Sequence, residues 1–210
     1  QSTMKSLYDV IKERILVLDG AMGTMIQAYN LKEEDFRGER FKNYSSSLKG
    51  NNDLLSITQP QIISEIHKKY LDSGADILET NTFSSNSISM ADYNMEDLVY
   101  ELNFESAKIA KKLSDEYSIK DSSKPRFVAG SIGPTNKTAS MSPDVSDPGF
   151  RAITFDELVI SYTEQIKGLV DGGVDILLLE TIFDTLNAKA ALFAIDTYME
   201  NNKLDIPLMV

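Results

Sequence analysis

Cysteine and tryptophan are absent from this chain of 210 residues, and His67 is its only histidine. Without cysteine, the chain cannot form disulfide bonds or bind a metal through thiolates. A single histidine cannot complete a zinc site of the ordinary type, and neither a Ser-His-Asp nor a Cys-His catalytic arrangement is credible. Since His67 lies close to Glu65 and Lys68 in a helical pattern, we expect it to be a surface residue.

Basic residues are scarce: 21 lysines and arginines stand against 32 aspartates and glutamates, which gives a net charge of −11. Nucleic acids and anionic membranes select basic surfaces, so this balance argues against both as the main partner. No apolar run approaches the roughly 18 residues that cross a bilayer, and the first residues lack a signal-peptide pattern. We therefore expect a cytoplasmic protein that binds neither nucleic acid nor membrane.

Short aliphatic runs alternate with helical patterns along the chain. Helical periodicity covers residues 59–74, 94–113, 154–173 and 185–200. Thr154 and Glu157 have the spacing of a capping box at the start of the third of these helices. Continuous aliphatic runs are typical of parallel strands that are buried on both faces. Five such strands are predicted to begin near residues 15, 75, 127, 174 and 206.

The predicted order is therefore β-α-β-α-β-α-β-α-β, with long loops after the first three strands. Long loops after strands are typical of a (β/α)₈ TIM barrel, which needs eight strands and about 250 residues. We interpret residues 14–210 as the N-terminal half of such a barrel, truncated to about four β/α units plus strand five. Residues 1–13 form a lead-in, in which Gln1–Thr3 before Met4 are typical of an expression remnant. A complete, flavodoxin-like sheet of five strands is the alternative.

Three acidic residues stand where a predicted strand gives way to a loop: Asp19, Glu79 and Glu180. Glu79 and Glu180 lie within two nearly identical stretches, DSGADILETNTF and DGGVDILLLETIF. The carboxyl ends of parallel strands meet at one edge, where ligands bind. Clustered carboxylates raise one another's pKa unless a cation offsets them, so the pattern predicts a site for an ammonium group or a metal ion. Alternatively, Glu79 and Glu180 accept backbone N–H groups in nearby loops or pair with lysine or arginine.

Two loops are also candidates for this edge. Gly20 and Gly23 in DGAMGTM lack the spacing of a dinucleotide or P-loop signature. They fit a turn that brings backbone amides to a small anion such as a carboxylate, or simply a glycine turn before a helix. Residues 130–149 form a long loop after strand three, which is either functional or merely solvated.

Several phrases are specific enough to suggest a family. VLDGAMGTMIQ, KGNNDLLSITQP, GADILETNTF, GPTNKTASMSPDV and LLLETIFDTLNAKAA occur in this order. Together they resemble the N-terminal, homocysteine-binding region of the cobalamin-dependent methionine synthase family, from about residue 15 to residue 210. In that family the region is a (β/α)₈ barrel, in which a zinc ion on three cysteine thiolates binds the homocysteine sulfur.

The resemblance also implies the reaction and the partners. The zinc-activated thiolate takes the methyl group of methylcobalamin, carried on a separate module, and gives methionine. Another module binds methyltetrahydrofolate and remethylates the cobalamin. Homocysteine and the methylcobalamin-carrying and folate-binding modules are thus the expected partners, and zinc and cobalamin the expected cofactors of the parent protein.

The resemblance assigns substrate-binding roles to seven residues: Asp19, Gly20, Gly23, Thr24, Glu79, Asn81 and Glu180. Asp19 and Glu180 match the acidic positions that hold the substrate ammonium. Gly20, Gly23 and Thr24 lie in the turn near the substrate backbone, and Glu79 and Asn81 match another strand end near the barrel mouth.

The family's zinc cysteines would lie beyond this chain, which departs from the full pattern. We therefore expect no catalytic residue, bound zinc or cobalamin, no methyl transfer by this chain alone, and weak or absent homocysteine binding. Open sheet edges should favour self-association. A non-catalytic small-molecule binding module, another homocysteine or thiol S-methyltransferase barrel and a phosphate-binding, aldolase-like barrel remain alternatives.

Overall fold

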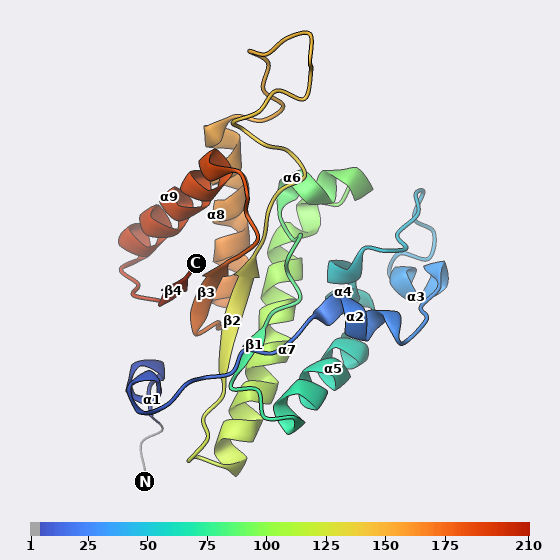
Figure 1. The fold of residues 1–210 in the computed structure, drawn as a ribbon. Helices are drawn as coiled ribbons and strands as arrows, with labels where there is room; N and C mark the ends of the chain where they lie inside the picture. The colour runs from blue at the N-terminus through green and yellow to red at the C-terminus, as the bar shows by residue number, and fades with distance from the viewer. Residues whose placement is uncertain (1–4) are drawn as a thin grey trace.

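The computed structural model describes residues 5–210; residues 1–4, which include the interpreted remnant, lie outside the described residues. A single parallel sheet has the strand order β1-β2-β3-β4 (Figure 1). Its members are β1 (Ile77–Glu79), β2 (Phe127–Ile132), β3 (Ile176–Leu179) and β4 (Leu208–Met209). The predicted α/β class with a parallel sheet is confirmed.

The first predicted strand is reduced to one bridge. Leu18 pairs with Ile77 in parallel, and the Asp19 amide donates to the Ile77 carbonyl at 2.9 Å. Ile15 and Val17 are 88% and 56% exposed, so their side chains gain little from packing. This stretch is an irregular edge beside β1 rather than a full strand, yet it still places Asp19 at the end of the sheet.

The helices cover both faces of the sheet. The bounds are α1 Leu7–Glu13, α2 Met22–Gln27, α3 Glu33–Arg37, α4 Leu55–Thr58, α5 Pro60–Asp72, α6 Ser87–Met90, α7 Val99–Lys120, α8 Phe155–Asp171 and α9 Thr185–Asn202, with single 3₁₀ turns at Asn52–Leu54, Ala91–Tyr93 and Glu96–Leu98. None of the helices within residues 5–210 has the length and apolarity to cross a membrane.

Side chains that alternate along the strands make two cores. Leu78, Val128 and Leu177 point to the long helices α7, α8 and α9. Their neighbours Ile77, Phe127 and Ala129, with Ile176 and Leu178, face the other way and pack against Leu7 and Val10 of α1. Residues 7–13 of the predicted lead-in are therefore a helix that covers the second face of the sheet.

The predicted helix signals are confirmed where they can be checked. The Glu157 amide donates to Thr154 Oγ1 at 3.2 Å, and the Thr154 amide donates to Glu157 Oε2 at 2.8 Å, which completes the capping box of α8. Gly173 follows α8 with φ +97°, a conformation that favours glycine. Within α8, a Cβ on Gly168 would lie 2.7 Å from the Tyr100 carbonyl oxygen, so glycine there permits close packing on α7.

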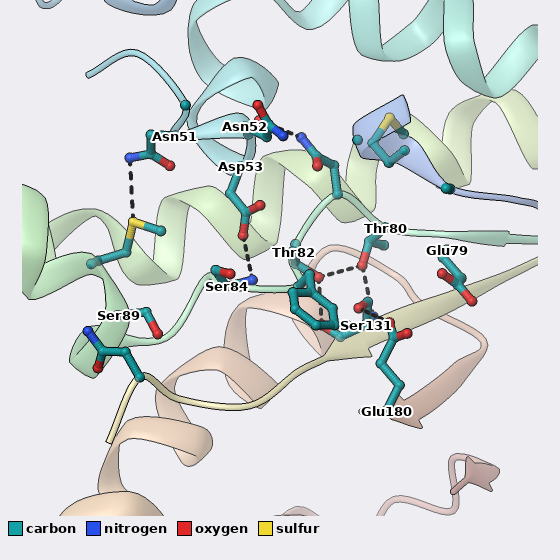
Figure 2. A pocket seen from close by; sticks show the side chains of 18 of the residues that line it. Asn51, Asn52, Asp53, Glu79, Thr80, Thr82, Ser84, Ser89, Ser131 and Glu180 are labelled. Carbon is teal, nitrogen blue, oxygen red and sulfur yellow. Dashed lines mark hydrogen bonds between the residues drawn. The ribbon is translucent and has the colours of Figure 1, made fainter. Parts of the chain in front are cut away.

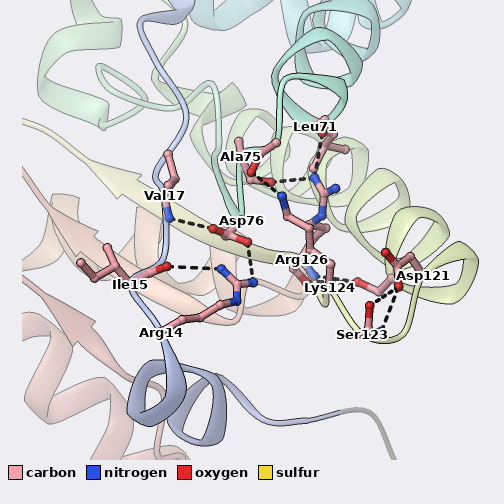
Figure 3. Close-up of polar contacts among 12 residues, drawn as sticks. Arg14, Ile15, Val17, Leu71, Ala75, Asp76, Asp121, Ser123, Lys124 and Arg126 are labelled. Carbon is pink, nitrogen blue, oxygen red and sulfur yellow. Dashed lines mark hydrogen bonds and ion pairs between the residues drawn. The ribbon is translucent and has the colours of Figure 1, made fainter.

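At the amino ends of the strands, opposite the predicted site, charged side chains form hydrogen bonds with neighbouring segments (Figure 3). Asp76 accepts hydrogen bonds from Arg14 Nη2 at 2.7 Å and from the Val17 amide at 2.8 Å. Burial alone would raise the pKa of Asp76, but these two bonds, together with the charges of Arg14 and Lys124, outweigh it and lower the pKa. Arg126 Nη1 donates to the carbonyls of Leu71 and Ala75 at 2.9 and 2.7 Å.

The prediction that His67 is a surface residue is wrong. Its side chain is 0% exposed, and neither ring nitrogen has a hydrogen-bond partner among the described residues. Ile63 and Leu71, four residues before and after it on α5, are also buried. The burial of the ring lowers the pKa of His67 to about 4, because the charged form would lose its hydration.

This burial predicts a loss of stability in acid. Between pH 6.5 and about 4 the unfolded chain protonates His67 and the folded chain does not. The free energy of unfolding should fall over that window by on the order of 3 kcal/mol from this residue. His67→Leu should remove that part of the pH dependence, as measured by urea unfolding at pH 7 and pH 4.5. Equal pH dependence in both proteins would contradict the assignment.

Candidate functional site

A cavity of about 500 Å³ opens at the carboxyl ends of the strands (Figure 2). Its wall contains the carboxyl side chains Asp19, Asp53, Glu79, Asp92 and Glu180. Within residues 5–210, no lysine, arginine or histidine lines it. The cavity is therefore strongly acidic and suited to a ligand that carries positive charge.

The structure brings the three predicted acids together in this cavity. Glu79 ends β1, Glu180 directly follows β3, and Asp19 lies beside them on the edge segment. Asp19 Oδ2 accepts the Glu79 amide at 3.1 Å, whereas Asp19 Oδ1 is buried without a partner among the described residues. None of the ion pairs found in residues 5–210 includes any of the three. The alternative of lysine or arginine pairing does not hold.

The acids disturb one another's ionisation. Burial, followed by the charge of Glu79, raises the pKa of Asp19 to about 8, and Glu180 adds to the effect. Burial and the charge of Glu180 raise the pKa of Glu79 to about 7. Near neutral pH, Asp19 and Glu79 therefore retain protons, which a bound cation would displace.

A chain of hydroxyl groups crosses the strand ends, as the dashed lines in Figure 2 show. The Ser131 amide donates to Thr80 Oγ1 at 3.0 Å, the hydroxyls of Thr80 and Thr82 lie 2.7 Å apart, and Thr82 Oγ1 donates to the Ser131 carbonyl at 2.7 Å. Ser131 Oγ donates to Glu180 Oε1. Polar groups from β1 and β2 thus support an acid at the end of β3.

The predicted glycine turn lies at the cavity, and the neighbours of Gly20 explain why it has no side chain. Neither glycine has a positive φ. A Cβ on Gly20 would lie 2.9 Å from the Tyr70 hydroxyl, which itself donates to the Ala21 carbonyl at 2.9 Å. Gly20 is therefore needed to make room for Tyr70, and Gly23 lines the cavity at the start of α2.

Thr24 and Asn81, two of the predicted site residues, differ in their position relative to the cavity. Thr24 is exposed on α2 and does not line the cavity. Asn81 does line it, but its amide nitrogen is engaged by the Asn52 carbonyl at 2.9 Å and by Ser56 Oγ at 3.3 Å. Asn81 therefore holds the 52–56 segment against the strand end.

Sequence reasoning missed Asp53 and Ser131. Asp53 is buried, and its Oδ2 accepts the Ser84 amide at 2.8 Å and Ser85 Oγ at 2.6 Å. Burial outweighs these bonds and raises the pKa of Asp53 to about 6. The signal for Ser131 was a lone hydroxyl inside an aliphatic run; Asp53 had only its place in a polar loop.

The long loop after β2 reaches the cavity only at its beginning. Asn136 lines the cavity and donates to Asp92 Oδ2 at 2.7 Å. The Ala139 amide donates to Asn187 Oδ1 at 3.0 Å, which ties the loop to the start of α9. Beyond this point the loop projects away from the body of the molecule (Figure 1).

Comparison with known proteins shows which family the chain belongs to. The family model for homocysteine S-methyltransferase matches residues 16–210. The chain belongs to the homocysteine S-methyltransferase family.

Solved structures similar to this homocysteine S-methyltransferase domain include the homocysteine methyltransferase MmuM from Escherichia coli. The metallated form has a TM-score of 0.70 and 21% identity, over 91% of this chain and 62% of that chain. The oxidized form gives 0.69 and 22% over the same shares, and the apo form gives 0.61 and 21% over 93% and 59%. The likeness shows a shared fold, and this chain spans about three fifths of the relative's length.

The acid cluster predicts a stability cost at high pH. Asp19 ionises near pH 3.8 when unfolded and near pH 8 when folded, so the free energy of unfolding falls as pH rises between these values. Asp19→Asn, which can still accept the Glu79 amide, should be close to the unsubstituted chain at pH 4. At pH 9 it should be more stable by on the order of 3 kcal/mol in urea unfolding.

Asp196→Asn, at an exposed position on α9, is the matched control and should change little at either pH. A lower stability of Asp19→Asn at pH 9 would show that the Asp19 charge is compensated in the folded chain.

Proposed function

We propose that this chain supplies the amino-acid-binding part of a homocysteine S-methyltransferase, with Asp19 and Glu180 holding the substrate ammonium. The observation that carries the proposal is the cluster of three carboxylates that belongs to no ion pair within residues 5–210. An ammonium group would supply the missing positive charge and displace the retained protons. Glu79 contributes to the same negative potential, and Gly20 and Gly23 line the same cavity.

The residues present do not fit the zinc ion that the family resemblance implies. The chain has no cysteine, and His67, its one histidine, is buried on α5 and does not line the cavity. Nor does any group of three or more candidate ligands within residues 5–210 have the geometry to hold a metal. Thiol activation and methyl transfer would therefore depend on residues outside this chain.

The specific parent proposed is a cobalamin-dependent methionine synthase. The phrases GPTNKTAS and ETIFDTLNAKAA support this choice, with methylcobalamin-carrying and folate-binding modules as partners. Residues 14–210 would be the N-terminal half of a (β/α)₈ barrel, which agrees with strands in sequential order and with a span of 62% of the metallated relative. Another homocysteine S-methyltransferase barrel is the second candidate, favoured by the likeness to MmuM.

Amine recognition can be tested by NMR titration of the labelled chain with L-methionine and L-homocysteine. We expect weak binding, on the order of millimolar, with shifts at residues 19–23, 79–81 and 180. Affinity should increase from pH 6 to pH 8 because Asp19 and Glu79 lose their protons over that range.

Asp19→Ala and Glu180→Ala should abolish these shifts, and 4-sulfanylbutanoate, which lacks the amine, should not produce them. Asp196→Ala should bind like the unsubstituted chain. Equal binding of the amine-free analogue, or of inorganic phosphate at the 19–23 turn, would contradict amine recognition.

Self-association is a further part of the proposal. Val17 lies at one exposed sheet edge, and Leu208 and Val210 are exposed at the other. Such edges pair readily with another chain. Light scattering after size exclusion should give twice the chain mass at high concentration, and Val17→Lys should shift the equilibrium to monomer. A clean monomer of the unsubstituted chain would count against this prediction.

A further inference from the structure

Ser131 is the one member of the hydroxyl chain that contacts an acid of the cavity. It lies in β2, pairs with Leu178 of β3 in register, and is 2% exposed. Its hydroxyl donates to Glu180 Oε1, and Glu180 stands two residues after Leu178. A buried serine on one strand therefore contacts the carboxylate that follows the next strand.

The donor and the acceptor of each hydrogen bond among Thr80, Thr82, Ser131 and Glu180 can be assigned. The Thr82 hydroxyl donates its single hydrogen to the Ser131 carbonyl oxygen, which can only accept. Thr80 must then donate to Thr82, while its oxygen accepts the Ser131 amide. These bonds hold the Ser131 backbone from β1, and the Ser131 hydroxyl is left to donate to Glu180.

The three acids differ in the donors they receive. Asp19 receives one backbone amide, that of Glu79 at 3.1 Å. The Glu79 side chain accepts no hydrogen bond within residues 5–210; it is the Glu79 backbone amide that takes part in one, as the donor to Asp19. Only Glu180 receives a side-chain donor, and a hydroxyl bound to a carboxylate fixes the orientation of that carboxylate.

We propose that Ser131 is a positioning residue of the amine site: its hydroxyl holds the Glu180 carboxylate toward Asp19 and Glu79, so that all three face one ligand cation. This inference rests on the proposed function. Without the hydroxyl, Glu180 would have no side-chain donor among the described residues and could turn toward solvent. Its charge would then act less on Glu79.

The consequence can be measured without any ligand. The charge of Glu180 contributes to the raised pKa of Glu79, about 7. Carbon-detected NMR titration of the side-chain carboxyls should show the Glu79 midpoint at least about 0.5 unit lower in Ser131→Ala, because the repulsion from Glu180 is weaker. Ser131→Thr keeps the hydroxyl and suits a strand, so it should restore the midpoint.

A matched control separates positioning from ordinary structural support. Ser118 on α7 is also buried, its hydroxyl donates to the Ser114 carbonyl at 2.8 Å, and it does not line the cavity. Ser118→Ala should lower the melting temperature without moving the Glu79 midpoint. Ser131→Ala should also weaken L-methionine binding about 5- to 10-fold, as one lost charge-assisted hydrogen bond implies, with Ser131→Thr close to the unsubstituted chain.

Two results distinguish the inference from the proposed function. An unchanged Glu79 midpoint in Ser131→Ala would overturn the positioning role, whether or not a ligand binds. Failure of the unsubstituted chain to bind L-methionine would instead count against the amine site, while the Glu79 titration would still decide whether Ser131 holds Glu180. Equal shifts in Ser131→Ala and Ser118→Ala would reduce Ser131 to structural support.

Discussion

Backbone pairing at the strand ends decides where Asp19, Glu79 and Glu180 lie in the candidate site. The parallel ladder continues one residue past each strand, since the Thr80 amide donates to the Ala129 carbonyl and the Glu180 amide to the Ile132 carbonyl, both at 3.0 Å. The Asp19 amide is held in the same way by the Ile77 carbonyl. Three segments that are distant in sequence thus end in one row, and their side chains share one cavity.

The pKa values of the aspartates at the two ends of the sheet are shifted in opposite directions. At the amino end, Asp76 has the Arg14 guanidinium and a backbone amide as partners, and its pKa is lowered. At the carboxyl end, Asp19 is half-buried beside two further acids, and its pKa is raised. The charged form of Asp76 stabilises the fold, whereas the charged form of Asp19 destabilises it, and a bound cation would offset this destabilisation. Local conflicts of this kind are typical of functional sites in otherwise consistent structures.

Periodicity and topology made much of this fold predictable. The long helices follow from their apolar stripes, and the meeting of Asp19, Glu79 and Glu180 follows from the common carboxyl edge of parallel strands. Burial of His67 was not predictable from its charged neighbours, because residues four positions away decide which face of a helix is covered. Ser131 and Asp53 depend on strand register and on contacts between loops, which one sequence does not reveal.

Helix α1 packs Leu7 and Val10 against side chains from β1, β2 and β3, including Ile176 and Leu178 near the other end of the chain. The neighbouring β-α units can associate through contacts that are close in sequence, but the surface that receives α1 exists only after all three strands have paired. Contacts of such long range carry the largest entropic cost of closure. Docking of α1 therefore depends on complete pairing of these three strands, and the helix is held by the least local part of the core.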